Sequence, residues 1–310
     1  MSRAKGPSTE RISAVASIRK ELDDRVGSRT EILGSMLGIK IRGGKLTRQL
    51  AITYFVREKI PKSELSPRKR VPMTLRMGNQ IVTTDVVEWP RMIEQYTATP
   101  TIISDGKTQG TLSCFASSDA GVFGISCAHC LVGADGRPAT PTEVAYFADN
   151  QQRWVEAGES VYLAYSAGAG LAGNYGYLDC GLFSLHDASL EARANSGQVL
   201  SVVSNTRSLL GSNLVAVSAL NAPGSTNHWR EAVVVGVEAD AMGERCDLVL
   251  AVEFPGTFHG DSGMLWLTQD GKAAAIHARG EERPGLQGSR LTTAMSAARV
   301  VDHLAIQMRI

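Results

Sequence analysis

The residues at 260–263 have types and a spacing that could perform nucleophilic chemistry. They read Gly-Asp-Ser-Gly and lie between a loop and an apolar run. A serine hydroxyl is a weak nucleophile at its free pKa, so Ser262 would need a base, a group that orients the base, and N–H donors for an oxyanion. Gly260 and Gly263 let the backbone bend sharply and approach a substrate without interference from a Cβ atom. Because Gly-Asp-Ser-Gly is also ordinary turn chemistry, the tetrapeptide alone leaves a catalytic and a purely structural interpretation equally open.

A candidate base and a candidate acid precede Ser262 in the chain. His129 lies near the end of the apolar segment 125–130, and Asp179 is a single aspartate inside the apolar segment 177–183. In a Ser-His-Asp triad the histidine takes the serine proton and the aspartate fixes the histidine tautomer. The order His, Asp, Ser is one of the chain orders in which such triads occur. The sequence therefore predicts a catalytic triad of His129, Asp179 and Ser262.

The position of Asp179 has an alternative interpretation. A lone aspartate in an apolar strand is unfavourable to bury without compensation, and a histidine Nδ1–H group would provide that compensation. The alternative is that Asp179 lies exposed at the edge of a strand. In that case Asp149 or Asp187 would be the substitute acid.

Two of these segments resemble motifs of the trypsin/chymotrypsin-type serine peptidases. Residues 126–130, Ser-Cys-Ala-His-Cys, are similar to the family's Ala-Ala-His-Cys, and residues 179–182, Asp-Cys-Gly-Leu, are similar to its Asp-Ile-Ala-Leu. The order His, Asp, Ser is also that of chymotrypsin. The likeness runs from about residue 110 to the C-terminus. It implies a mostly β fold, namely a chymotrypsin-like double β-barrel with a C-terminal helix.

The resemblance also implies a reaction. His129 would take the Ser262 proton and return it to the leaving amine, so that a peptide bond is hydrolysed through an acyl-enzyme intermediate. The N–H groups of Gly260 and Ser262 would form the oxyanion hole. The alternatives are a catalytically silent, peptidase-like binding scaffold, and an esterase or acyltransferase that uses the same triad.

The substrate pocket departs from that of trypsin, in which an acidic residue six positions before the nucleophile selects arginine or lysine. Gly256 stands at this position, so a cationic side chain would lose its partner. The family's Ser-Trp-Gly pocket wall corresponds to Ala-Arg-Gly at 278–280. Arg279, with His259 and His277 nearby, could favour an acidic side chain, although a buried and satisfied histidine is an equally good interpretation.

Asp261 raises a question about activation. In secreted relatives this aspartate pairs with an N-terminus that is freed by cleavage, and the pair orders the oxyanion hole. Here about a hundred residues precede the peptidase-like domain. Asp261 would therefore pair either with an internal lysine or arginine, or with a new N-terminus formed by cleavage near residues 101–103. We expect the internal partner, because the stretch from Ile102 to Cys114 is shorter than the family's usual stretch.

Composition and charge exclude several classes of protein. The 310 residues include 32 Lys and Arg against 31 Asp and Glu, so the charge does not favour a nucleic-acid partner. An apolar content of 43% without a long apolar run predicts a soluble globule with no membrane partner. The N-terminus lacks the apolar core of a secretory signal, and five irregularly spaced cysteines fit a reducing compartment. We therefore expect a cytoplasmic protein.

The cysteines near His129 permit two further interpretations. Cys127 and Cys130 flank the histidine at a spacing that metal sites use, but no second pair of ligands is evident and structural zinc generally has four. We therefore expect no metal and no other cofactor. Cys114 and Cys130 match the histidine-loop disulfide of the resembling family, and we expect both to remain thiols in a reducing cytoplasm.

Three segments are expected along the chain. Residues 1–31 form an N-terminal helix and tail, residues 32–95 a small α+β leader domain, and residues 96–310 a peptidase domain whose two barrels divide near residue 195. The leader resembles one found in a bacterial and plant subgroup that includes the plant narrow-leaf peptidase. A protein or peptide substrate is the expected partner, and a regulatory partner and a homo-oligomer are open possibilities.

Hydrophobic patterning places the elements that would position these residues. Apolar residues recur every three or four positions in 9–26, which predicts an amphipathic helix. A helical turn is expected at 60–65, a polar linker at 91–107 and a C-terminal helix at 293–308. Short apolar runs predict strands at residues 36–41, 50–56, 80–87, 111–116, 121–126, 198–203, 214–218, 231–237, 247–252 and 272–277.

Overall fold

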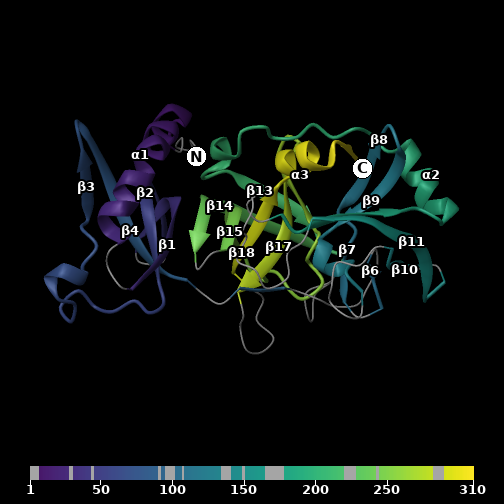
Figure 1. Ribbon diagram of the computed structural model, residues 1–310, viewed down its shortest axis with the longest axis horizontal. Helices are drawn as coiled ribbons and strands as arrows, with labels where there is room; N and C mark the ends of the chain where they lie inside the picture. The colour runs from purple at the N-terminus through teal and green to yellow at the C-terminus, as the bar shows by residue number, and fades with distance from the viewer. Residues whose placement is uncertain are drawn as a thin grey trace.

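The computed structural model gives a mostly β protein in which three groups of elements follow one another along the long axis (Figure 1). A leader lies at one end, a closed barrel in the middle and a half-barrel at the other end. The expected chymotrypsin-like, mostly β architecture with a C-terminal helix is confirmed. The structure describes residues 7–27, 31–42, 45–89, 92–94, 102–106, 108–133, 141–148, 151–164, 178–219, 228–241, 244–281 and 290–310.

The leader combines one helix with four strands. Its elements are α1 (Thr9–Gly27), β1 (Ile32–Arg42), β2 (Lys45–Val56), the 3₁₀ helix η1 (Pro67–Lys69), β3 (Thr74–Met77) and β4 (Gln80–Glu88). β1 and β2 form an antiparallel pair, β4 lies parallel to β2, and β3 completes the edge against β4. The helix and the three strands expected in this segment are confirmed, whereas the helical turn expected at 60–65 is replaced by turns that precede η1.

Helix α1 forms because its apolar residues lie on one face. Ile12, Leu22 and Val26 are buried in a core that also contains barrel residues, while Lys20 and Asp24 form an exposed ion pair at 3.3 Å on the polar face. Tertiary packing of such a face is what stabilises a helix of this length in water. Among the described residues, no helix is both long enough and apolar enough to cross a bilayer.

The leader and the closed barrel share one sheet, because β1 pairs antiparallel with β14 of the barrel. At Gly34 the backbones approach so closely that an added Cβ would lie 1.8 Å from the Asp240 carbonyl oxygen, so the pairing requires glycine there. Arg19 of α1 ties the same region together by donating to the carbonyl oxygens of Ser35 at 2.8 Å and Glu238 at 2.6 Å. The leader is thus held to the barrel by both backbone and side-chain contacts.

The closed barrel is made by the C-terminal half of the chain. Its strands are β13 (Asn213–Val217), β14 (Trp229–Ala241), β15 (Glu244–Val252), β16 (Leu265–Thr268), β17 (Ala273–Glu281) and β18 (Leu291–Ser296). They pair in the order β13-β16-β17-β18-β15-β14, and a further pairing of β13 with β14 closes the ring. The 3₁₀ helix η3 (Thr206–Leu209) precedes β13, and the short strand β5 (Met92–Glu94) pairs with β17 outside the ring.

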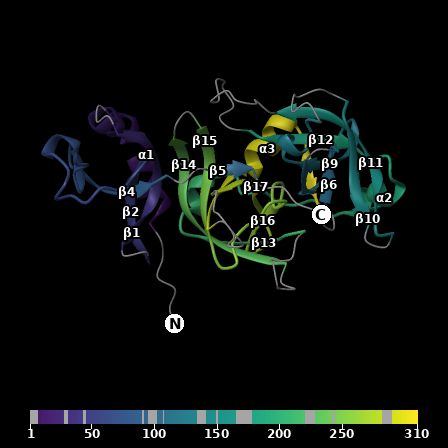
Figure 2. The same cartoon turned by 90° about the horizontal axis from the view of Figure 1, so that it is seen from below.

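The half-barrel is an eight-stranded sheet of order β19-β8-β9-β12-β11-β10-β6-β7. Its elements are β6 (Ile102–Ser104), β7 (Gln109–Thr111), β8 (Cys114–Ser118), β9 (Gly121–Ser126), the 3₁₀ helix η2 (Ala128–Cys130), β10 (Glu143–Ala148), β11 (Arg153–Ala164), β12 (Cys180–Ser184), α2 (Ala188–Ser196) and β19 (Gln307–Arg309). Helix α2 contacts β8 and β9, and Figure 2 shows it at the far end of the molecule from the leader.

The C-terminal segment differs from the single helix expected at 293–308. Residues up to Ser296 belong to β18, because Thr292, Ala294 and Met295 are buried between the neighbouring strands β15 and β17. The helix α3 (Ala297–Leu304) follows, and the left-handed backbone of Ala305 ends it. The chain then crosses to the half-barrel as β19, so the two β units are strapped together by the C-terminus.

Two other stretches also depart from the expected elements. Residues 198–203 make only isolated bridges, at Val199 and Val202, instead of a strand. The segment 91–107, expected to be a linker, contains the strands β5 and β6. Their length hides them, because each has 3 residues and a strand pattern is recognised over runs of about 4–8 residues.

Several apolar cores hold the groups together, and three of them contain most of the buried residues. The largest joins α1 and the leader strands to the closed barrel, a second fills the half-barrel, and a third lies between the two β units. The third contains Ile125 and Cys180 from the half-barrel with Leu265, Ile276 and Met295 from the closed barrel. The interface between the β units is therefore a continuous apolar core.

The shared core makes a prediction about α1. Replacing Leu22, which is fully buried, by alanine is expected to lower the free energy of unfolding by about 2–5 kcal/mol through lost burial and a residual cavity. Urea unfolding followed by circular dichroism measures the change. Lys20→Ala on the exposed face is the control and should change stability by less than about 0.5 kcal/mol. Equal effects of the two substitutions would show that α1 does not belong to the core.

Candidate active site

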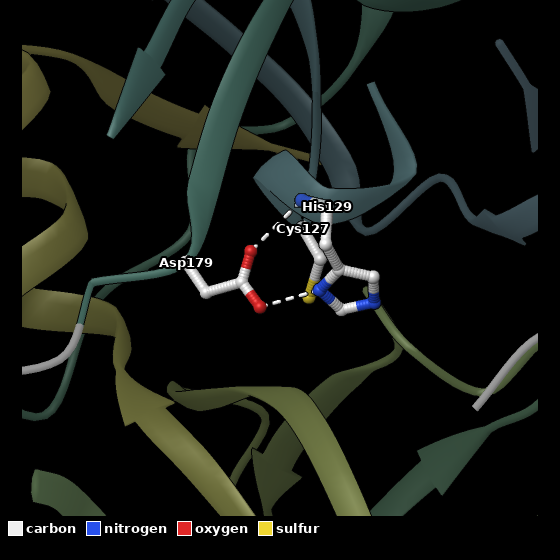
Figure 3. Close-up of side chains that lie close together, drawn as sticks. All are labelled: Cys127, His129 and Asp179. Carbon is white, nitrogen blue, oxygen red and sulfur yellow. Dashed lines mark hydrogen bonds and ion pairs between the residues drawn. The ribbon is translucent and has the colours of Figure 1, made fainter. Parts of the chain in front are cut away.

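The half-barrel brings His129 and Asp179 together through strand pairing. His129 lies in η2, directly after β9, and Asp179 lies directly before β12. Because β9 and β12 pair antiparallel with Ser126 opposite Gly181, the end of one strand lies beside the beginning of the other. The Asp179 carboxylate contacts the ring Nδ1 of His129, and its other oxygen accepts the His129 backbone N–H at 2.9 Å (Figure 3). The carboxylate therefore fixes both the ring and the backbone of the histidine.

Burial and charge act in opposite directions on this pair. Burial by itself would lower the pKa of His129, but the charge and hydrogen bond of Asp179, together with Cys130, outweigh it and hold that pKa well above its ordinary value. Burial would likewise raise the pKa of Asp179, but the positive charges of His129 and Arg279 and the hydrogen bonds from His129 lower it instead. The fold therefore favours an imidazolium beside a carboxylate.

Ser262 lies in a glycine-bounded turn of the closed barrel. Gly260 and Gly263 have φ angles of 97° and 94°, which only glycine adopts without strain. The Ser262 hydroxyl is fully buried and donates to the carbonyl oxygen of Ala278 in β17 at 2.9 Å. The backbone N–H of Asp261 is bonded to Phe258 within the same loop.

The half-barrel clamps this turn from the other side. Thr111 donates its backbone N–H to the Ser262 carbonyl at 2.7 Å and its hydroxyl to the Gly260 carbonyl at 2.6 Å. The Ser113 hydroxyl donates to the carbonyl of Gly263. An added Cβ on Gly263 would lie 2.1 Å from the Thr111 carbonyl oxygen, so the approach needs glycine. The turn is thus positioned by both β units.

Two shared contacts place the serine turn beside the histidine segment. The His277 carbonyl accepts the Gly263 N–H at 2.9 Å and the Cys127 thiol at 3.1 Å, so both segments meet at one oxygen atom. An added Cβ on Gly110 would meet Cys130 Sγ at 2.3 Å on one side and the Ser262 carbonyl oxygen at 3.0 Å on the other. The structure therefore brings the three predicted triad residues to one interface.

Asp261 has an internal charged partner. Arg230 of β14 lies fully buried with its Nε 3.6 Å from Asp261 Oδ2, which also accepts the Phe258 N–H at 2.8 Å. The Ser218 hydroxyl donates to the other carboxylate oxygen. Burial raises the pKa of Asp261, and Arg230 and Ser218 counteract part of that rise. The internal basic partner expected for Asp261 is therefore present, and it is an arginine.

The predicted pocket residues differ in their surroundings. Gly256 is buried with a φ of 87°, His259 is exposed, and Arg279 is half-buried close enough to Asp179 to lower its pKa. His277 is fully buried, and its burial, with the positive charges of His129 and Arg230, lowers its pKa to about 3. His277 is therefore neutral at ordinary pH.

The buried cluster of Cys127, His129 and Asp179 contains three groups that ligate metals, with their ligand atoms within 4.8 Å of one another (Figure 3). The cluster does not fit a metal ion. The His129 Nδ1 atom is already in contact with the Asp179 carboxylate, and three ligands are fewer than the four that structural zinc generally has.

All five cysteines are buried thiols. Cys114 and Cys130, which correspond to the disulfide of the resembling family, are not bridged. Burial raises the pKa values of Cys114 and Cys180 to about 12, so these thiols are protonated and poor nucleophiles.

Sequence reasoning missed several residues that position the site. Arg230 had one signal, because it is a charge just before the apolar run at 232–237; the structure buries it to 1% exposure. Thr111 and Ser113 had none, because their role depends on a loop that lies 149 and 150 residues further along the chain. Of the substitute acids, Asp187 caps the N-terminus of α2, and Asp149 lies outside the described residues.

Comparisons with known proteins give one family match and several similar structures. Residues 12–87 match the family described as the NARROW LEAF 1 N-terminal domain. Among the curated proteins, none matches the chain.

Several solved structures are similar at low identity. A glutamic acid specific serine protease that uses a histidine triad in substrate binding is 12% identical, covers 67% of this chain and 97% of its own, and has a TM-score of 0.42. Protease A of Thermobifida fusca is 16% identical, with coverages of 68% and 96% and a TM-score of 0.42. The MamO protease domain of Magnetospirillum magneticum is 13% identical, with coverages of 67% and 97% and a TM-score of 0.36.

The depressed pKa of His277 predicts a pH dependence of stability. Below pH 6.5 the unfolded chain protonates this histidine, while the folded chain does so only near pH 3, so acidification favours unfolding. At about 1.4 kcal/mol per pH unit, this amounts to roughly 2 kcal/mol between pH 6.5 and pH 5. His129 adds only a small opposing contribution near pH 6.5, because its raised pKa keeps it protonated in the folded chain and the unfolded chain becomes fully protonated there as the pH falls below 6.5.

Urea unfolding at several pH values tests this expectation. His277→Gln should lose less stability than the wild type on acidification, and the difference between the two should reach the predicted size at pH 5. His186→Gln removes an exposed histidine and should keep the slope of the wild type. If the His277 and His186 variants have the same pH dependence, then His277 accepts a proton in the folded state.

The buried pair of Asp261 and Arg230 predicts an asymmetric mutational effect. Arg230→Met leaves the buried carboxylate without its charged partner and is expected to destabilise the fold by about 3–5 kcal/mol. Adding Asp261→Asn removes the uncompensated charge and should recover part of the loss. Arg245→Met, which breaks an exposed ion pair with Asp240, is the control and should lose about 0–1 kcal/mol. Equal losses at Arg230 and Arg245 would contradict the assignment.

Proposed function

We propose that the protein is a serine endopeptidase that hydrolyses peptide bonds through a His129-Asp179-Ser262 triad. The observation that carries the proposal is the contact between Asp179 and both the ring and the backbone N–H of His129. This arrangement leaves the opposite ring nitrogen, Nε2, as the atom that exchanges protons with a serine hydroxyl. The serine turn lies at the same interface, as the shared contacts at His277 and Gly110 support.

The reaction proceeds in two balanced steps. Ser262 Oγ attacks the peptide carbonyl carbon while His129 Nε2 takes the hydroxyl proton, and the proton then passes to the leaving amine as the C–N bond breaks. Water attacks the resulting ester, gives one proton to His129, and releases the new carboxyl group as Ser262 recovers its hydrogen. Asp179 stabilises the imidazolium in both steps, which its effect on the pKa of His129 supports.

The oxyanion formed in each step requires N–H donors. We propose those of Gly260 and Ser262, which belong to the turn held by Thr111 and by the Asp261–Arg230 pair. Donors that are fixed before the reaction stabilise developing charge without reorganisation, and loss of one typically raises the barrier by about 3 kcal/mol. The glycine φ angles support this assignment, because they orient the peptide planes of a tight turn.

Arg279 is the residue that supports a preference for an acidic substrate side chain. It is half-buried beside the pair of His129 and Asp179 and carries a permanent positive charge. His277 is neutral and provides no charge. We place the substrate, a protein or peptide, in the cytoplasm, and the five buried thiols support a reducing compartment.

A second candidate function is a peptidase-like scaffold that binds peptides without turnover. One observation favours it: the Ser262 hydroxyl is fully buried and donates to the Ala278 carbonyl. In the endopeptidase proposal the same observation describes a resting state, from which the side chain must rotate before it attacks. The two candidates differ in whether Ser262 ever becomes a nucleophile.

A fluorophosphonate probe separates these candidates. We expect slow labelling at Ser262 under prolonged incubation, loss of the label in Ser262→Ala, and a decrease of at least tenfold in His129→Ala. Labelling should accelerate as the pH rises above 6.5, because only neutral His129 accepts the proton and its pKa is raised. Peptide mass spectrometry locates the label.

Ser208→Ala, which changes an exposed serine of η3, is the matched control and should label like the wild type. Folded protein that never labels at Ser262, even at high pH and high probe concentration, would overturn the endopeptidase proposal and leave the binding scaffold. If Ser262 labels, turnover of a peptide substrate and of an ester substrate by the wild-type protein is compared, which tests whether the leaving group is an amine.

A further inference from the structure

The strand β5 occupies an unusual place beside the closed barrel. It lies on the segment that connects the leader to the half-barrel, yet it pairs antiparallel with β17 of the barrel (Figure 2). The register places Glu94 opposite Arg279, Ile93 opposite Gly280, and Met92 opposite Glu281. A segment far upstream in the chain therefore adds a strand to the barrel.

The position of β5 follows from where β16 ends. β16 pairs with one side of β17. This pairing begins at Leu265, which lies opposite Ile276. The residues before Leu265 turn away as the loop that carries Ser262. From Arg279 onward the backbone of β17 is paired with β18 on one side and with β5 on the other. β5 thus fills the edge that the serine loop leaves open.

This edge directly adjoins the candidate nucleophile. Arg279 follows Ala278, whose carbonyl accepts the Ser262 hydroxyl at 2.9 Å. A strand edge presents N–H and C=O groups that bind an extended chain irrespective of its sequence. A peptide bound there would run past Ser262, and a segment of the protein already bound there would exclude it.

We propose that β5 is a built-in occupant of the β17 edge at 279–281, where it takes the place of an extended peptide and keeps the site closed. This inference rests on the proposed function for its consequence, because a closed site matters only if Ser262 reacts. The burial of the site supports it, since His129 is 1% exposed and Asp179 and Ser262 are 0% exposed. A substrate or a regulatory partner must displace β5 to open the site.

β5 is short enough to dissociate from β17. It comprises 3 residues, whereas an average strand has about five or six, so few ladder hydrogen bonds hold it. Its attachment to the same chain compensates, because a tethered segment binds at a high effective concentration. A free peptide competes poorly until a rearrangement weakens the pairing of β5 with β17.

Proline substitutions in β5 test the proposal, because proline removes the N–H group that a ladder needs. Alternate residues of an antiparallel strand direct their N–H groups to the same partner, so two variants cover both cases: Ile93→Pro, and Met92→Pro with Glu94→Pro. At least one is expected to label Ser262 with fluorophosphonate at least tenfold faster than the wild type. Ile93→Ala keeps the N–H group and should stay within twofold. Circular dichroism confirms that each variant is folded.

A binding measurement separates this inference from the proposed function. Ser262→Ala, alone or combined with the prolines, is titrated with a fluorescent peptide that has the sequence of residues 90–96, and anisotropy is recorded. We expect at least tenfold tighter binding to a proline variant, whether or not Ser262 is reactive. If all variants bind the 90–96 peptide with equal affinity, the proposal that β5 occupies the edge of β17 is wrong. Wild-type protein that labels as fast as both proline variants would overturn its inhibitory role and leave the endopeptidase proposal standing.

Discussion

The conformation of the turn at 260–263 depends on contacts with both β units, which pack against it from opposite sides. Its carbonyl groups accept hydrogen bonds from Thr111 and Ser113 of the half-barrel, while the closed barrel buries Asp261 against Arg230 beneath it. A glycine-rich turn has high conformational entropy when it is free, so these contacts are what confine it. The geometry of the candidate nucleophile is therefore a property of the interface, and it depends on the apolar core that joins the two units.

Electrostatics divide the buried ionisable groups of this interface into two kinds. Asp179 and Asp261 each lie beside a positively charged group, which is His129 in one case and Arg230 in the other. His277 lies near both positive charges and stays neutral, since a third buried cation would be strongly unfavourable. The site thus favours charged forms of the Asp179–His129 and Asp261–Arg230 pairs and keeps the His277 ring neutral.

The leader is connected to this site by backbone pairing and by a shared apolar core. Its sheet passes into the barrel through β1 and β14, and the barrel core contains residues of α1. The chain that leaves the leader then pairs with β17 beside Ala278 before it enters the half-barrel. The leader, β5 and β17 are therefore joined both by the covalent chain and by backbone pairing.

The sequence by itself determined what local chemistry and periodicity encode: the buried face of α1, most barrel strands, and a histidine and an aspartate placed at the ends of strands. Because strand ends are local features, His129 and Asp179 could be named before their contact was seen. Only the tertiary structure decided that Asp261 pairs with Arg230, that the segment expected as a helix at 293–308 is divided into β18, α3 and β19, and that β5 pairs with β17. These outcomes depend on which distant segments meet, and a pattern of neighbouring residues carries no information about such contacts.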